Sequence, residues 1–233
     1  TRHKVAFNMG THRRWDPGFE TMKHLVYNGG MGALRSMIIH GTGQLYNSGS
    51  HWFDLCLWLN NDAPVEWVQG HLPEGDAVLD GDVLLKDPVG EGIVRFVNGV
   101  TVYALNTPRG PEFEAICDKG AITSENNGLR WSIRRRPSGS RIPWDLQPAP
   151  FPKYTRQSLS KRLVEDLVHA LDTGEPTRGG VEVARANQEI IAAFIESHRA
   201  GGARVRLPVT NRRVRLGTDV PGRRVKLTPD ARW

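Results

Sequence analysis

Cysteine is scarce in this sequence: its 233 residues contain two, Cys56 and Cys117. The two do not form a C-x-x-C metal motif, and a single pair makes no disulfide framework. We therefore expect both thiols to be reduced, and Cys56 to act as a small apolar side chain within a buried helix. This usage of cysteine favours a reducing, cytoplasmic compartment.

Long apolar segments are also missing. No run approaches the roughly 18 residues of a membrane-spanning helix, so we expect no membrane partner. The first residues, T-R-H-K-V-A-F-N, lack the apolar region of a signal peptide. The sequence begins with Thr rather than Met, which favours a processed chain or a fragment.

The glycine-rich signatures of nucleotide binding are absent as well. No G-x-G-x-x-G follows a predicted strand, and Gly41-Thr42-Gly43 lacks the third glycine. There is no P-loop, no G-x-S-x-G nucleophile elbow, and no set of three His or carboxylate residues at metal-ligand spacing. These residues therefore predict no dinucleotide pyrophosphate site and no metal centre.

The net charge is +6, and arginine supplies most of the positive charge: 24 Arg against 7 Lys. The arginines group at 134–136 and in the tail after Thr210, without interleaved aromatic residues. Acidic residues are interspersed through most of the chain, so we expect solvated surface charge rather than nucleic-acid binding. Nucleic-acid binding by the tail is the alternative, and its affinity would fall steeply with salt.

The most informative stretch is Asn47–Leu59, N-S-G-S-H-W-F-D-L-C-L-W-L. A helix that is apolar nearly all round is normally buried, yet His51 and Asp54 project from one face of this one. Burying ionisable groups is costly unless they pair or are used. His51 is therefore the best candidate for a general acid or base, with a satisfied core histidine as the alternative. Asp54 could orient the imidazole or pair elsewhere.

A second group of candidates lies in the loop H-R-R-W near the N-terminus. Arg13 and Arg14 could grip a polar or anionic substrate or one end of a cofactor, and a solvated loop pair is an equal alternative. Trp15 could stack against a sugar ring. The tryptophans of the buried helix, Trp52 and Trp58, are more often core residues.

The chain reads as a series of strands with four helices. Asp16-Pro17 opens a helix that ends near Asn28, before Gly29-Gly30. Asn98-Gly99 carries the strongest turn signal for a hairpin. A Pro-rich connector without a periodic pattern spans residues 137–152. The predicted strands are 4–8, 34–40, 65–71, 92–97, 100–105, 112–117, 121–125, 129–135 and 205–208.

Two amphipathic helices close the main body. The first carries an apolar stripe that we expect to face the core, formed by Leu159, Leu163, Leu167, Ala170 and Leu171. The second spans 181–198. The pattern predicts an α+β fold with one large, mostly antiparallel sheet and helices packed on one face. The other face would be open to a partner subunit.

Several segments, in order, resemble the C-terminal substrate-binding part of the Gfo/Idh/MocA oxidoreductases. K-V-A-F-N with R-R-W-D-P resembles the last Rossmann strand and the turn after it, and N-S-G-S-H-W-F-D-L resembles the D-x-G-x-H-x-x-D helix. Five further segments resemble parts of the same family: N-G-G-M-G-A-L-R-S, G-I-V-R-F-V-N-G-V, D-K-G-A-I-T, E-P-T-R-G-G-V-E-V-A-R-A-N-Q-E-I and R-V-R-L-P-V. The similarity covers about Val5–Val209 and implies a fold like the C-terminal domain of glyceraldehyde-3-phosphate dehydrogenase.

The resemblance implies a division of the chain. Residues 1–14 would be the last strand and exit loop of a truncated dinucleotide-binding domain, 15–209 the substrate-binding and oligomerisation domain, and 210–233 a basic tail. The Rossmann domain and the family's catalytic Lys would precede Thr1. NAD or NADP would bind the complete enzyme, and neither would bind this chain tightly alone.

The resemblance also implies roles for single residues. His51 would be catalytic, and Asn47, Arg13, Arg14, Asp54 and Trp15 would contact substrate. Asn47 stands where the family has Asp; since an amide cannot relay a proton, it would hydrogen-bond a substrate hydroxyl. The substrate would be a sugar, cyclitol or related polyol, and the protein a homo-oligomer. The alternative is a non-catalytic binding or scaffold protein derived from this fold.

Overall fold

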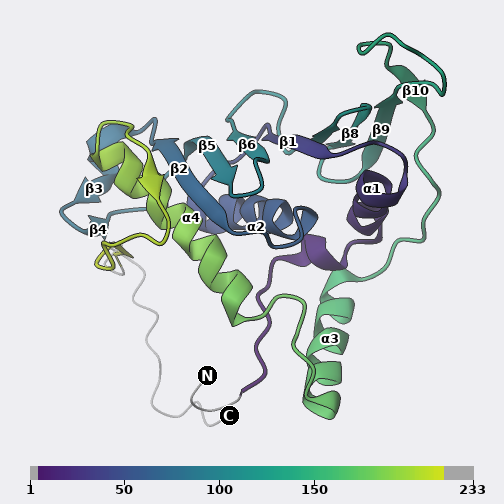
Figure 1. The fold of residues 1–233 in the computed structure, drawn as a ribbon. Coiled ribbons are helices and arrows are strands. Elements are labelled where there is room, and N and C mark those ends of the chain that lie inside the picture. The colour runs from purple at the N-terminus through teal and green to yellow at the C-terminus, as the bar shows by residue number, and fades with distance from the viewer. Residues whose placement is uncertain (1–4, 218–233) are drawn as a thin grey trace.

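The computed structural model describes residues 5–217, and a nine-stranded sheet dominates them (Figure 1). The strand order is β10-β9-β8-β7-β1-β6-β5-β2-β11, and β1 with β6 is its single parallel pair within the described residues. The strands are β1 Leu34–Ile39, β2 Val65–His71, β5 Glu91–Phe96, β6 Thr101–Ala104, β7 Phe113–Cys117, β8 Gly120–Glu125, β9 Arg130–Arg135, β10 Gln147–Ala149 and β11 Val205–Arg206.

Helices pack on one face of this sheet, which confirms the predicted α+β fold (Figure 1). The α-helices are α1 Pro17–Asn28, α2 Ser50–Leu59, α3 Leu159–Thr173 and α4 Val181–Arg199. Shorter helical turns are η1 His12–Trp15, η2 Leu45–Gly49 and η3 Gly75–Val78. A small second sheet joins β3 Leu79–Asp80, β4 Val83–Leu84 and β12 Arg215–Leu216 in the order β12-β4-β3.

The local signals in the sequence account for several of these boundaries. The Asp16 carboxylate accepts a hydrogen bond from the Gly18 amide at 2.7 Å and so caps α1, whose first residue is Pro17. Gly99 adopts a positive φ of 89° in the turn between β5 and β6, where glycine carries no steric penalty. These two features explain why the helix and the hairpin form where the sequence predicts them.

Close packing of α4 on the sheet depends on one glycine. A Cβ atom on Gly70 of β2 would lie 2.6 Å from the Phe194 ring and 2.8 Å from the Phe194 Cα. Phe194 in turn lies against Phe53 of α2, with ring centroids 5.2 Å apart. The core therefore fixes α2, and with it His51, against both α4 and the sheet.

The opposite face of the large sheet carries apolar side chains. Ile38 of β1 and Ile93 of β5 both pair in register with Tyr103 of β6 between them. Tyr103 is 41% exposed, and no helix of residues 5–217 covers this side of the sheet (Figure 1).

Three expectations about elements need correction. Residues 5–8 form no strand, because no neighbouring strand within the described residues offers them a ladder; instead Met9 N–H donates to the Gly179 carbonyl at 2.8 Å. The connector at 137–152 contains β10, which pairs antiparallel with β9. The apolar stripe of α3 is partly covered but lies outside the hydrophobic core: Ala170 is buried, Leu159, Leu163 and Leu167 are half-buried, and Leu171 is 67% exposed.

The tail is only partly described. Residues 215–216 form β12 beside β4, and the Arg212 guanidinium hydrogen-bonds the Glu189 carboxylate. Arg223 and Arg224 lie outside the described residues. None of the helices between residues 5 and 217 combines the length and the apolar character that crossing a bilayer requires.

Candidate active site

His51 lies in the first turn of α2, directly after the π-helical turn η2. π-helical turns occur frequently at functional sites. Asn187 of α4 donates from Nδ2 to the Ser50 carbonyl at 2.7 Å and so anchors the start of α2 from the side. This contact positions the residue that precedes His51, and Asn187 is itself completely buried.

The surroundings of His51 keep its ring uncharged. Burial, the Arg13 guanidinium and His12 lower the pKa of His51 to about 4. The His12 and His51 ring centroids lie 6.2 Å apart. No side chain or backbone group of the described residues hydrogen-bonds the His51 ring, so its basic nitrogen is available to an incoming group. The sequence led us to expect that this imidazole titrates near neutral pH. The structure instead indicates a ring that is already uncharged at pH 7.

Arg13 is held beside this ring by stacking. Its guanidinium carbon lies 3.7 Å from the centroid of the Trp52 ring, and Nη2 donates to Asn127 Oδ1 at 2.7 Å. Burial lowers the pKa of Arg13 to about 10, against the opposing charges of Asp16 and Asp54. Trp52 stacks on Phe113 of β7, with ring centroids 6.1 Å apart. A rigid aromatic pair thus supports the arginine next to His51.

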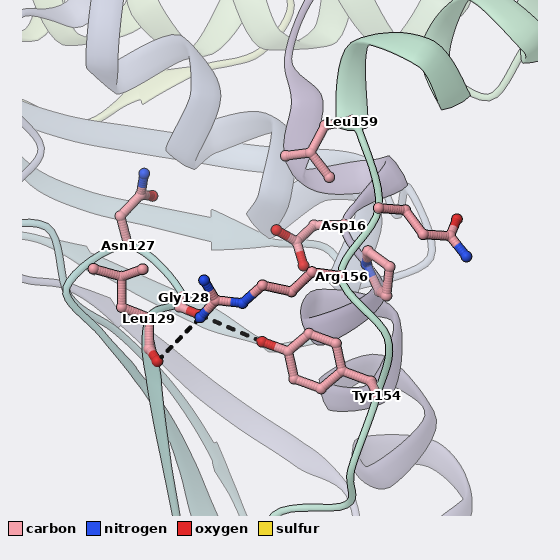
Figure 2. Close-up of a pocket in the computed structure, with 9 residues that line it drawn as sticks. Asp16, Asn127, Gly128, Leu129, Tyr154, Arg156 and Leu159 are labelled. Atoms are coloured by element: carbon pink, nitrogen blue, oxygen red, sulfur yellow. Dashed lines mark hydrogen bonds between the residues drawn. The ribbon is translucent and has the colours of Figure 1, made fainter.

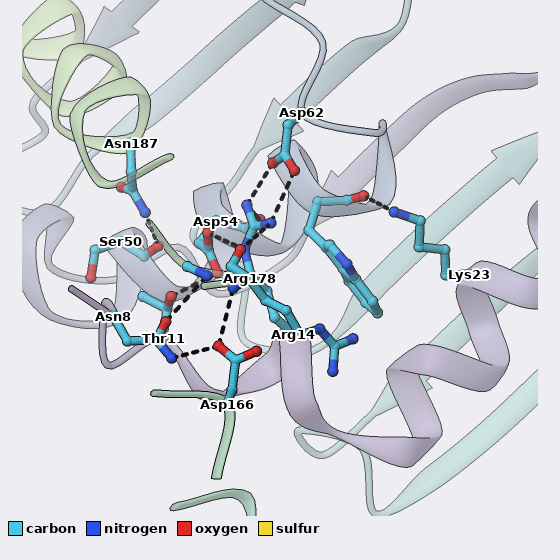
Figure 3. Close-up of polar contacts among 12 residues, drawn as sticks. Asn8, Thr11, Arg14, Lys23, Ser50, Asp54, Asp62, Asp166, Arg178 and Asn187 are labelled. Atoms are coloured by element: carbon cyan, nitrogen blue, oxygen red, sulfur yellow. Dashed lines mark hydrogen bonds and ion pairs between the residues drawn. The ribbon is translucent and has the colours of Figure 1, made fainter. Parts of the chain in front are cut away.

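Arg14 and Asp54 lie in the interior rather than at the site (Figure 3). Asp54 accepts from Arg14 Nε at 2.7 Å and from Thr11 Oγ1 at 2.7 Å. Arg14 also donates to both carboxylate oxygens of Asp62, at 2.6 and 3.1 Å. The network ties the loop before α1 to α2 and to the turn after it.

These positions correct two expected roles. Asp54 does not orient His51, because both of its oxygens are used by Arg14 and Thr11. Arg14 is 1% exposed and Trp15 is also 1% exposed, so neither side chain can reach a substrate in this arrangement. We assign Arg14, Trp15 and Asp54 a structural role in holding the loop that carries Arg13.

Asn47 is exposed, four residues before His51 on the continuous helical stretch. Its backbone N–H donates to Asp87 Oδ2 at 2.9 Å, and no described residue hydrogen-bonds its side-chain amide. Because residues four apart share a helix face, Asn47 is placed to act together with His51.

A cavity of about 200 Å³ opens beside Asn127, the residue that Arg13 binds (Figure 2). The turn between β8 and β9 forms one wall, and the segment before α3 forms another. Tyr154 OH donates to the Gly128 carbonyl at 3.4 Å and accepts from Trp131 Nε1 at 2.9 Å. Arg156 Nη2 donates to the Leu129 carbonyl at 3.4 Å. The residues that line the cavity are Asp16, Pro17, Asn127, Gly128, Leu129, Tyr154, Arg156, Gln157 and Leu159.

The sequence did not identify four residues of this region as parts of the site: His12, Asn127, Asn187 and Trp52. Of these, Trp52 supports Arg13. Asn127 has a positive φ of 57° within N-N-G, so the sequence reveals a turn but not its distance from Arg13. His12 precedes the arginine pair directly, and that adjacency was the one usable signal. Among residues 5–217, no three His, Cys, Asp or Glu side chains gather in a way that could hold a metal ion.

Neither a scan of protein-family models nor a search of curated proteins found a match. Solved structures do match. An aldose-aldose oxidoreductase from Caulobacter crescentus, complexed with glycerol, aligns with a TM-score of 0.67 and 16% identity over 87% of this chain and 64% of its own. A protein from Desulfitobacterium hafniense described as an NADPH-dependent oxidoreductase aligns with a TM-score of 0.68 and 15% identity, over 87% of this chain and 65% of its own.

GenD2 from gentamicin A biosynthesis, in complex with NAD, aligns with a TM-score of 0.59 and 17% identity over 86% of this chain and 63% of its own. This chain therefore spans less than two thirds of the length of these proteins. At such identities the alignments show the fold alone. The fold of the described residues is that of the matched part of Gfo/Idh/MocA-type oxidoreductases, as the sequence resemblance implied.

Proposed function

We propose that this chain is the substrate-binding portion of an NAD(P)-dependent oxidoreductase that acts on a sugar, cyclitol or related polyol. One observation carries the proposal: His51 presents an uncharged imidazole with no hydrogen-bond partner among the described residues, beside Arg13, in a fold shared with oxidoreductases. A neutral imidazole is the form that can accept a proton from a substrate hydroxyl.

Each residue has a distinct part in this reaction. His51 takes the hydroxyl proton as the carbinol is oxidised and returns it in the reverse direction. Asn47 and Arg13 hydrogen-bond substrate oxygens and fix the carbinol against the ring. The cofactor, when bound, accepts or donates the hydride. Asn187 and the Arg14–Asp54 pair hold the helix and the loop in place.

The neighbours support the substrate and cofactor classes. One is an aldose-aldose oxidoreductase complexed with glycerol, and another binds NAD. The turn between the parallel strand β1 and η2 contains Gly41-Thr42-Gly43, which lacks the third glycine of the dinucleotide-binding signature. We therefore propose that NAD or NADP is bound mainly by a separate nucleotide-binding portion, with residues 1–14 as its exit, and that this chain alone binds neither tightly.

The exposed side of α3 supports a docking surface for that portion. Val164, Val168 and Leu171 are 54%, 48% and 67% exposed along one helix. A contiguous apolar stripe on a surface typically marks an interaction site. About a third of each neighbour's chain has no counterpart here, which is enough for a further domain.

The open face of the sheet, with Tyr103 at its centre, supports a homo-oligomer. We propose that residues 15–209 include this oligomerisation surface. The two cysteines are free and buried, in keeping with the reducing, cytoplasmic compartment proposed from their scarcity.

A non-catalytic scaffold derived from this fold is the second candidate, and the exposed face of the sheet would serve it equally well. The DNA upstream of the Thr1 codon distinguishes the two. An in-frame Rossmann sequence, together with NAD(P)-dependent oxidation of polyols by the encoded protein, supports the enzyme. A start codon at that point and no turnover with either cofactor would reject it.

A further inference from the structure

Arg13 forms no ion pair with a described carboxylate, and the charges of Asp16 and Asp54 act on it only from a distance. Its single hydrogen bond among the described residues goes to the neutral Asn127 amide oxygen, and its Nε is buried without a partner. Its neighbour Arg14, by contrast, pairs with two carboxylates. Arg13 is half-buried, and a guanidinium group that is partly removed from water is costly unless an anion compensates it.

A second arginine without an anionic partner lines the adjoining cavity. Arg156 contacts a backbone carbonyl, that of Leu129, and forms no ion pair with any described residue (Figure 2). Asn127 belongs both to this cavity and to the hydrogen bond with Arg13. Asn127 therefore links the two arginines, since it binds Arg13 and lines the cavity together with Arg156.

Asp16 is the only carboxylate in the lining, and it is already in use. Its Oδ1 accepts from the Gly18 amide as the cap of α1. Two guanidinium groups against one carboxylate leave this region with an excess of positive charge. Arginine binds carboxylates with planar, often bidentate, charge-assisted hydrogen bonds.

The dimensions of the cavity suit a small ligand. Its volume of about 200 Å³ lies below the range of about 300–1,000 Å³ typical of drug-sized ligands. The Tyr154 ring and the side chains of Pro17 and Leu159 supply apolar walls, and the polar groups stand at Asn127 and Arg156.

We propose that the substrate is a sugar acid, an aldonate or uronate, whose carboxylate is bound by Arg13 and Arg156 beside Asn127, with a carbinol group facing His51. The proposal rests on the oxidoreductase function above and narrows its substrate class from a neutral polyol to an anionic one. The guanidinium groups contribute N–H donors to the carboxylate, and the Asn127 amide remains a donor to a neighbouring hydroxyl.

Binding to the present chain tests this directly. D-glucuronate and D-glucose are titrated separately at constant ionic strength, and the signals of His51 and Trp52 are followed by NMR. We expect glucuronate to shift both signals and to bind about tenfold more tightly than glucose, because its carboxylate forms charge-assisted hydrogen bonds. Bound glucuronate also raises the pKa of His51, since its charge offsets that of Arg13.

Arg156→Gln is the informative variant, because Arg156 is exposed and its loss does not endanger the fold. We expect this variant to lose about tenfold in glucuronate affinity and to bind glucose as before. Arg141→Gln removes the same charge from the exposed loop after β9, at the opposite end of that strand from the cavity, and should change neither affinity.

Two results would overturn the proposal: equal affinities for glucuronate and glucose, or no effect of glucuronate on the chain. An Arg156→Gln variant that binds glucuronate as well as the unmodified chain would do the same. None of these results touches the oxidoreductase function, which is tested separately through His51 and NAD(P) turnover.

Discussion

Arg14 Nε donates to Asp54 Oδ1 across 2.7 Å, and the two side chains are 1% and 0% exposed. Removing one partner of such a pair leaves the other charge buried. We expect Arg14→Gln to lower the free energy of unfolding by about 3–5 kcal/mol. Urea denaturation at pH 7 measures this change.

An exposed pair supplies the control. Arg206 and Glu66 lie 3.3 Å apart with side chains 79% and 39% exposed. Arg206→Gln should lower the free energy of unfolding by less than about 1 kcal/mol. If Arg14→Gln cost no more than Arg206→Gln, the structural role of the buried pair would be wrong.

The lowered pKa of His51 predicts how stability depends on pH. A histidine has a pKa of about 6.5 when unfolded, and burial, Arg13 and His12 lower that of His51 to about 4 in the folded chain. Between these values the unfolded chain binds the proton more tightly, so the contribution of His51 to stability is complete above pH 6.5 and is lost as the pH falls toward 4.

His51→Gln isolates this contribution. Unfolding free energies of the two chains, compared from pH 7 to pH 4, should diverge, with the unmodified chain losing more stability on acidification. NMR titration of the ring gives the pKa itself, and Arg13→Gln should raise it. A His51 ring that titrates near 6.5 in the folded chain would contradict the neutral-base assignment.

The close contact of Gly70 with Phe194 predicts that even an alanine side chain at position 70 destabilises the fold. An alanine Cβ at this position would meet the Phe194 ring at 2.6 Å and the Phe194 backbone at 2.8 Å, so α4 would have to shift. We expect Gly70→Ala to reduce the free energy of unfolding by about 1–3 kcal/mol. Gly10→Ala, where no atom lies within 4 Å of the added Cβ, should be nearly neutral in the same denaturation assay.

The local features of the fold could be predicted from the sequence, and the long-range ones could not. Asp16, Pro17 and Asn98-Gly99 act on their own neighbours, so the start of α1 and the β5–β6 hairpin follow from short patterns. The partners of Asp54 lie 40 or more residues earlier in the chain, at Arg14 and Thr11. No periodicity within α2 reveals them.

Two expectations failed for the same physical reason. The apolar residues at 5–8 and the stripe of α3 both favour burial, but a sequence pattern does not say what buries them. Within the described residues no strand pairs with the first, and the second is only partly covered. The candidate site showed the same limit: His51 was predictable as an ionisable residue in an apolar helix, whereas the position of Asn127 beside Arg13 became visible only in three dimensions.

The open face of the sheet predicts self-association. Tyr103 stands between Ile38 and Ile93 in the cross-strand register, and it is 41% exposed. We expect sedimentation velocity to show a dimer or tetramer, and Tyr103→Arg to shift it toward the monomer because a charge would be buried at the interface. An unmodified chain that stays monomeric at concentrations of about 100 μM, where even a micromolar interface would be filled, would rule out this surface.

The activity of His51→Ala is the measurement that bears most directly on the central claim. It is made by NAD(P)H absorbance in the protein that carries both the nucleotide-binding portion and residues 5–217. If His51 transfers the hydroxyl proton, kcat falls by about 10²–10⁴ while the cofactor binds as before. A kcat within a few-fold of the unmodified enzyme would remove His51 from the chemistry.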